Sequence, residues 1–190
     1  MESEPRMKGP VTAVGTVAAK NYLARVRVLA ESLAAHHPEL PLFVMLTDEI
    51  DGRFVEADEP FNLIGFAELR VRDISLRSFA FAYDRKTLAA ACKPLLLGNL
   101  LNRGYSRVVY VDADTLLLGR IDSVLRKLED LSILLCPHRL RPPSGDGRVA
   151  ADLGLLRSGT YNAGLLGVRD SEPARRFIDW WWNRLRRHCR

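Results

Sequence analysis

Uninterrupted apolar runs alternate with segments of helical spacing along the first half of the chain. Residues 11–17 and 42–46 are short, uncharged and rich in β-branched or large aliphatic side chains, which predicts strands buried on both faces. Between them, apolar residues recur three and four positions apart from Tyr22 until Pro38 interrupts the pattern, which predicts a helix. The chain therefore begins with a strand, a helix and a second strand.

The second half of the chain repeats this order. The remaining predicted elements are a strand near residues 63–66, a helix over 87–102, a strand over 107–111, a helix over 121–128, strands over 132–136 and 161–168, and a final helix capped by Ser171. Pro94 should kink or restart the first of these helices, and residues 137–159 have the composition of a long loop. The order predicts an α/β fold, a Rossmann-type three-layer sandwich with a mostly parallel central sheet.

Composition is typical of one soluble globular domain, since 47% of the 190 residues are hydrophobic and 27% are charged. We expect residues 1–10 to be flexible and residues 11–190 to form a single domain. The three cysteines form no CxxC pair, which argues against a zinc knuckle or a disulfide framework and fits a reducing cytosol. Neither a signal peptide nor about 18 consecutive apolar residues occurs, so we expect a cytoplasmic protein without a membrane span.

The formal net charge of +5 is compatible with a nucleic-acid surface or with a cleft for an anionic small molecule. Basic residues are spread along the chain and concentrate only in residues 184–190, where the solvated face of a helix explains them. We therefore expect no nucleic-acid partner.

Two carboxylates, Asp112 and Asp114, directly follow the apolar strand over residues 107–111. An extended backbone would place both side chains on the same side, where their mutual repulsion calls for a cation or a hydrogen-bond donor. Oxygen ligands of this kind suit Mg²⁺ or Mn²⁺, which take further ligands from phosphate and water. A metal there would stabilise the diphosphate that leaves a nucleotide-diphosphate sugar. The alternative is a solvated pair of aspartates at a turn.

A second motif begins the strand over residues 161–168. Asn162 and Gly164 would offer an amide and a closely approaching backbone to a sugar hydroxyl, although a turn into a core strand has the same composition. Ligands of open α/β sheets bind beyond the carboxyl ends of the strands, which indicates Thr16, Asp112 and the loop after Cys136.

Together, Asp112-Ala113-Asp114 and the Tyr161–Val168 segment resemble the glycosyltransferases of family 8, the glycogenin-like proteins with a GT-A fold, over residues 11–187. The resemblance implies a GT-A-like sandwich and sugar transfer from a UDP-linked donor, with retention of configuration, to an acceptor that the sequence does not identify. It also implies Mn²⁺ or Mg²⁺ on Asp112 and Asp114. The positions implied for the donor are Thr16 and Tyr22 at the uracil, Ala113 at the ribose, Lys93 on the preceding helix, and Asn162 and Gly164 at the sugar.

The chain departs from the family at two points. It lacks the family's Asp-Gln pair after the last predicted helix and the C-terminal His-x-x-Gly-x-x-Lys segment, so it resembles a member truncated at the C-terminus. Its histidines, among them His37, are expected at the surface. The catalytic residues are therefore not assigned, and a catalytically incomplete donor-binding or scaffold protein is an alternative.

A haloacid-dehalogenase-like phosphatase is the other alternative, because its first motif also reads DxDxT, as in Asp112 to Thr115. That class needs a later lysine, and Lys127 is the only lysine after Thr115. The sequence leaves a homo-oligomer open.

Overall fold

The computed structural model describes residues 11–48, 52, 54–66, 69, 76–141, 153–155, 157 and 159–188. The expected flexible N-terminus, residues 1–10, lies outside the described residues, as does the centre of the predicted loop, residues 142–147.

A six-stranded sheet in the order β3-β2-β1-β4-β6-β5 forms the middle of the molecule. Its strands are β1 (Thr12–Ala18), β2 (Leu42–Leu46), β3 (Asn62–Gly65), β4 (Arg107–Val111), β5 (Ile133–Pro137) and β6 (Tyr161–Arg169). The first four strands pair in parallel, whereas β6 lies between β4 and β5 and is antiparallel to both. The predicted mostly parallel sheet is confirmed. Nothing in the apolar run of β6 indicated its reversed direction, because strands buried on both faces have the same composition in either direction.

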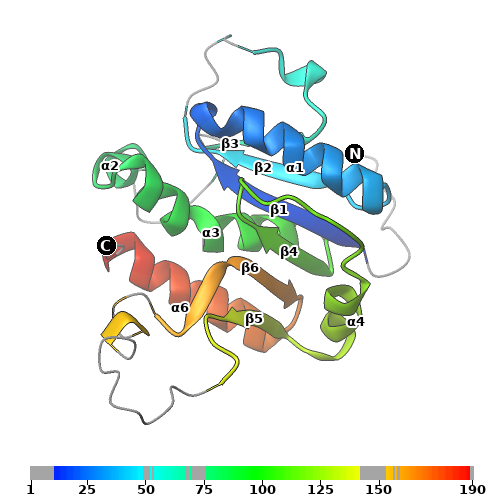
Figure 1. Ribbon diagram of the computed structural model, residues 1–190. Coiled ribbons are helices and arrows are strands. Elements are labelled where there is room, and N and C mark those ends of the chain that lie inside the picture. Colours follow the sequence, from blue (N-terminus) through cyan, green and yellow to red (C-terminus); the bar gives the residue numbers. More distant parts are fainter. Residues whose placement is uncertain are drawn as a thin grey trace, which may run out of the picture.

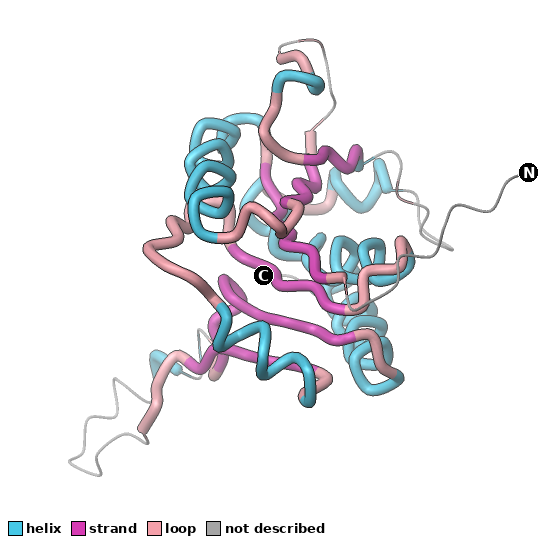
Figure 2. The backbone as a smooth tube through the Cα atoms, turned by 90° about the vertical axis from the view of Figure 1, so that its right-hand side faces the viewer, coloured by secondary structure: helices cyan, strands magenta, loops and turns pink. Residues whose placement is uncertain are grey.

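Helices cover both faces of the sheet, which gives the predicted three layers (Figures 1 and 2). The helices are η1 (Lys20–Tyr22), α1 (Leu23–His36), η2 (Glu56–Asp58), α2 (Leu76–Phe81), α3 (Arg85–Asn102), α4 (Asp122–Asp130) and α6 (Glu172–His188). α1 and α4 pack on one face of the sheet, and α2, α3 and α6 on the other. Residues 153–155 and 157 are helical, so the segment predicted as a loop contains a helical turn.

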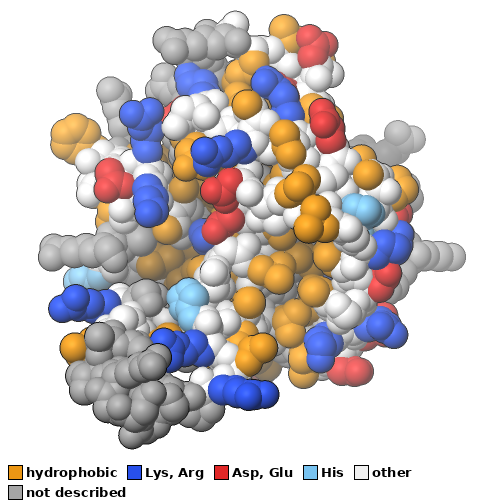
Figure 3. Space-filling model, in the orientation of Figure 1, with side chains coloured by type: hydrophobic (Ala, Val, Ile, Leu, Met, Phe, Trp, Pro, Cys, Tyr) orange, Lys and Arg blue, Asp and Glu red, His pale blue; other side chains and the backbone are white. Residues whose placement is uncertain are grey.

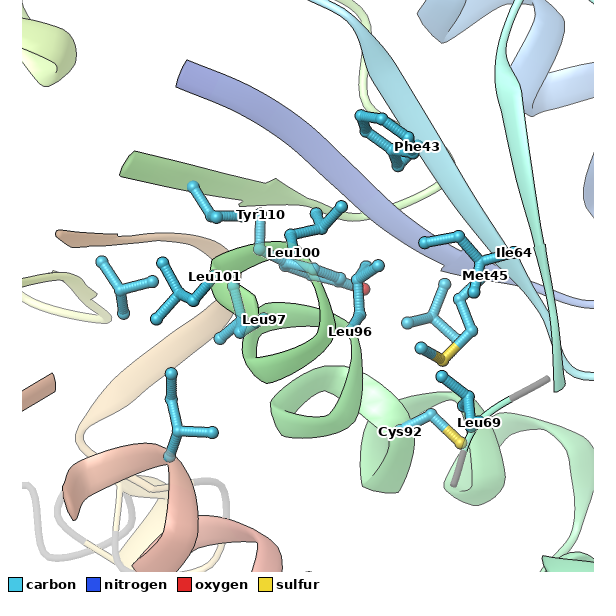
Figure 4. Packing of buried hydrophobic residues seen from close by; sticks show 14 of the residues in the cluster. Phe43, Met45, Ile64, Leu69, Cys92, Leu96, Leu97, Leu100, Leu101 and Tyr110 are labelled. Atoms are coloured by element: carbon cyan, nitrogen blue, oxygen red, sulfur yellow. The ribbon is translucent and has the colours of Figure 1, made fainter. Parts of the chain in front are cut away.

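Each face of the sheet has its own apolar core. Under α3 and α6, fully buried leucines such as Leu96 and Leu100 meet the side chains of β1, β2 and β4 (Figure 4). Under α1, Val26 and Leu33 meet the opposite faces of the same strands. Each such side chain stabilises the fold by about 1.5–3 kcal/mol relative to its exposed state. Tyr110, 1% exposed, is a polar side chain inside the first core.

α3 is one continuous helix with Pro94 inside it, so the expected interruption does not end the helix. Pro94 has no N–H to donate to the carbonyl of Ala90, one turn earlier. The helix begins at Arg85, two residues before the predicted start, because the Asp84 side chain accepts a hydrogen bond from the Thr87 N–H (2.8 Å). Packing of its apolar face on two strands outweighs the lost hydrogen bond.

α6 docks on α3 through its apolar stripe. The predicted cap is confirmed, since Ser171 Oγ accepts from the Ala174 N–H (3.4 Å). Of the three tryptophans of α6, both Trp181 and Trp182 pack against this core. The ring of Trp182 packs edge-on against Phe79 at a centroid distance of 5.0 Å, because α2 lies over this end of α6.

Candidate functional site

A cavity of about 450 Å³ opens at the carboxyl ends of β1 and β4. The end of β1 and the residues after it (17–19, 21 and 22) form one wall, and one face of α3 forms another. Tyr110 on β4 and residues 112–114 after it complete the lining. β1 is followed by a helix on one face of the sheet, while the helix that leads into β4 lies on the other face. The cavity therefore lies at the point where the connections diverge, which is the usual ligand site of open α/β sheets.

Opposite charges face one another in this cavity. Arg85, Lys86 and Lys93 project from α3, and Asp112 and Asp114 follow β4. In Figure 3, acidic side chains lie among Lys and Arg side chains near the middle of the face shown. Three cationic side chains beside two carboxylates favour an anionic ligand over a neutral one.

Asp112 is held by two donors on one oxygen. Lys93 Nζ lies 2.8 Å and the Tyr110 hydroxyl 2.9 Å from Oδ1. Burial, followed by the adjoining Asp112 carboxylate, raises the pKa of Tyr110 well above its ordinary value of 10.0, so its hydroxyl stays protonated and donates. Lys93 also donates to the carbonyl of Ala163 at 2.9 Å, which joins α3 to β6.

Asp114 is more open, with its side chain 54% exposed. Arg25 Nη1 lies 3.6 Å from its Oδ2, and the Arg25 guanidinium carbon lies 4.8 Å from the centre of the Tyr22 ring. Tyr22 itself lines the cavity. Exposed ion pairs of this kind contribute about 0–1 kcal/mol, so Arg25 leaves Asp114 available to a stronger cation.

The backbone turns at these carboxylates, and it is not extended as the sequence argument assumed. The Thr115 N–H donates to the carbonyl of Asp112 (3.0 Å), which closes a turn. Both side chains still reach one cavity, because the turn follows the strand end directly.

Two buried side chains, one on α1 and one directly after it, hold the segment that follows this turn. Ser32 Oγ accepts from the Leu117 N–H (3.2 Å), and His37 Nε2 accepts from the Ile121 N–H (2.8 Å). The expectation that His37 lies at the surface is wrong. It is 0% exposed, because its ring fills the junction between the end of α1 and the start of α4.

The start of β6 touches Asp112 directly. The Asp112 N–H donates to the carbonyl of Gly164 (2.9 Å), and the Gly164 N–H donates to Asn162 Oδ1 (2.6 Å). A Cβ on Gly164 would lie 2.7 Å from Asp112 Oδ2, so a larger residue there would require the Asp112 carboxylate to shift. The two sequence motifs, about 50 residues apart, therefore meet as one site.

Four of the residues predicted to contact the donor lie in this cavity or beside it. Tyr22, Lys93 and Ala113 line the cavity, and Gly164 contacts Asp112. Asn162 is exposed at the start of β6. Thr16 is fully buried inside β1 and is not a lining residue, so its role stays a prediction.

Sequence reasoning missed three polar or charged residues that line the cavity: Asn21, Arg85 and Lys86. The signal for the last two was present, because they lie about two turns before Lys93 on the same helical face. Starting the helix at Thr87 excluded them.

The donor set fits a divalent cation. Both carboxylates line one cavity. Among the described residues, no group of three His, Cys, Asp or Glu side chains is close enough together to hold a metal by itself. Mg²⁺ and Mn²⁺ are commonly held by one or two carboxylates together with substrate phosphates and water, so two suffice.

Known structures resemble this fold, although no protein-family model and no curated protein sequence matches the chain. Mouse xyloside xylosyltransferase 1 superposes with a TM-score of 0.52 and 14% identity, over 93% of this chain and 72% of that one. The bifunctional glycosyltransferase WbbM superposes with a TM-score of 0.50 and 16% identity, over 97% of this chain and 34% of that one. The chain has a GT-A fold.

LgtC, a galactosyltransferase solved with donor and acceptor sugar analogs, aligns with 92% of this chain and 65% of its own, at 17% identity and a TM-score of 0.49. The GT-A chain described here thus spans about a third of WbbM and less than two thirds of LgtC. In the described part of the chain, no helix has the length and apolar character needed to cross a membrane.

Proposed function

We propose that this GT-A domain binds a nucleotide-diphosphate sugar, UDP-linked, together with Mn²⁺ or Mg²⁺, and transfers the sugar to an acceptor. The observation that carries the proposal is that Asp112, Asp114, Tyr22 and Lys93 line a single cavity at the divergence of β1 and β4. The family 8 resemblance alone implies that the transfer is a retaining hexosyl transfer.

Asp112 and Asp114 would hold the metal, which supplies Lewis-acid stabilisation of the leaving diphosphate. The apolar end of β1 and the ring of Tyr22 provide a surface on which a base can pack. Arg85 and Lys86 at the cavity attract the anionic donor and raise its rate of association.

The alternatives make different demands on the site. A phosphatase would need Lys127 beside Asp112, but Lys127 is exposed on α4 and is not a cavity residue. A donor-binding or scaffold protein would keep the cavity and lack turnover.

Thermal unfolding tests the proposal with Mn²⁺, with UDP and with both, on the unmodified protein and on Asp112→Asn/Asp114→Asn. A ligand at 100 times its Kd stabilises the folded state by about 2.7 kcal/mol, which raises the Tm of a domain this size by roughly 5–11 °C. We expect UDP to stabilise only when Mn²⁺ is present, and the double variant to lose that effect. Glu56→Gln/Asp58→Asn is the charge-matched control, because both side chains are exposed on η2 and neither lines the cavity.

Release of UDP from UDP-sugars then separates transfer from binding alone. Metal-dependent stabilisation without UDP release would identify the donor-binding alternative. Stabilisation that survives in the double variant would refute the metal site, and Mg²⁺-dependent hydrolysis of p-nitrophenyl phosphate would identify the phosphatase.

A further inference from the structure

The two oxygens of the Asp112 carboxylate have different surroundings. Oδ1 accepts hydrogen bonds from Lys93 Nζ (2.8 Å) and from the Tyr110 hydroxyl (2.9 Å). A carboxylate oxygen has two lone pairs, so two donors occupy Oδ1 fully. Oδ2 faces Gly164, which has no side chain, and a Cβ at Gly164 would lie 2.7 Å from this oxygen.

The two donors are themselves fixed. Lys93 and Tyr110 are 7% and 1% exposed, and Lys93 Nζ lies 4.6 Å from the centre of the Tyr110 ring. The ammonium group also donates to the carbonyl of Ala163. Rotating Asp112 would leave the buried Tyr110 hydroxyl without its acceptor and the buried ammonium without its carboxylate partner, which is costly for buried polar groups.

We propose that Tyr110 and Lys93 are positioning residues that leave only Oδ2 of Asp112 available to the divalent cation. The proposal rests on the metal site proposed above. It assigns Lys93 a task within the protein in addition to the donor contact that the family resemblance implies.

The number of available carboxylate oxygens also affects which metal binds. Mg²⁺ takes six ligands in near-ideal octahedral geometry, whereas Ca²⁺ takes six to eight oxygens and often binds both oxygens of a carboxylate. A carboxylate restricted to one oxygen therefore favours Mg²⁺ or Mn²⁺ over Ca²⁺. Freeing Oδ1 should weaken Mn²⁺ binding and reduce this preference.

Tyr110→Phe removes one donor and keeps the buried ring. The matched control is Tyr83→Phe, because the Tyr83 hydroxyl also donates a hydrogen bond, to the carbonyl of Leu185 (2.8 Å), away from the cavity. Mn²⁺ binding is measured from the electron paramagnetic resonance signal of free Mn²⁺, and Ca²⁺ binding by competition. Groups that orient a metal ligand typically contribute 10–100-fold to affinity, so we expect the Mn²⁺ Kd to rise about 10-fold in Tyr110→Phe.

In the same variant, the ratio of the Ca²⁺ Kd to the Mn²⁺ Kd should fall, while Tyr83→Phe changes neither Kd. If Tyr110→Phe does not fold, Lys93→Gln tests the selectivity alone. Losing a cation beside Asp112 tightens the binding of both divalent metals, so only the ratio of their Kd values reports the freed oxygen. Unchanged Mn²⁺ affinity and selectivity in the folded variant, in a protein whose Mn²⁺ binding requires Asp112, would overturn the positioning role alone. An unmodified protein that does not bind Mn²⁺ would overturn both the metal site and the positioning role.

Discussion

The contact between Gly164 and Asp112 leads to a substitution with a sharp expected result. In Gly164→Ala, the new Cβ would lie 2.7 Å from Asp112 Oδ2 and 2.8 Å from Asn162 Oδ1, whereas ordinary contacts begin near 3.4 Å. The carboxylate would have to move by 0.7 Å, the difference between 3.4 and 2.7 Å.

Asp112 cannot move freely, because Oδ1 is held by Lys93 and Tyr110. Losing one hydrogen bond to this charged group would lower the free energy of unfolding by about 1.5–3 kcal/mol. For a domain of this size the Tm would fall by roughly 3–12 °C. Displacement of the carboxylate should also abolish Mn²⁺ binding, because Oδ2 is the oxygen that moves.

Gly98→Ala is the control, because the same substitution should raise the stability of the fold at this position. Gly98 lies inside α3, and its new Cβ would meet Ile178 Cγ2 at an ordinary 3.6 Å. Glycine inside a helix is less stable than alanine by roughly 0.5–1 kcal/mol, so this variant should melt slightly higher and bind Mn²⁺ normally.

Thermal unfolding and Mn²⁺ titration of the two variants check the reasoning together. If Gly164→Ala keeps both the Tm and the Mn²⁺ affinity of the unmodified protein, the start of β6 yields easily, and the rigid contact inferred here is wrong.

Two further substitutions test neighbouring contacts. Arg25→Ala removes the cation beside Asp114, so Mn²⁺ should bind about two- to threefold more tightly at low salt, as expected for an exposed ion pair. At about 1 M salt this difference should disappear. Equal Mn²⁺ affinity of Arg25→Ala and the unmodified protein at low salt would show that Arg25 does not compete with Mn²⁺ for Asp114. Ser32→Ala leaves the buried Leu117 N–H without its acceptor and should lower the free energy of unfolding by about 1–3 kcal/mol. Urea unfolding measures that loss, and an unchanged midpoint would mean that Ser32 does not hold the segment after β4.

Local patterns in the sequence predicted most of the individual elements. Continuous apolar runs marked β1, β2 and β4 to within a residue or two, because strands buried on both faces allow no polar side chain. Helical composition predicted α3. Its start was missed, because the Asp84 cap depends on a hydrogen bond that composition only suggests. The long segment before β6 was less predictable, since its helical turn at residues 153–155 has no clear apolar periodicity.

Some residues of the site were also predictable from the sequence and others were not. Two carboxylates after a buried strand were enough to predict that both side chains lie in one cavity, because both follow directly on a strand end. Their companions were harder to foresee. Arg25 and Tyr110 reach the aspartates through packing of α1 and of the core, and His37 was expected at the surface but is buried.

By itself, then, the sequence determined the order of strands and helices, the layered α/β class and the identity of the acidic pair, since each depends on short-range periodicity or on a contiguous motif. Only the tertiary structure decided that β6 runs antiparallel between β4 and β5, which brings Gly164 against Asp112 and the carbonyl of Ala163 within reach of Lys93. The physical reason is that strand order and direction are set by how all the apolar faces are buried at once. No local stretch of the chain carries that information.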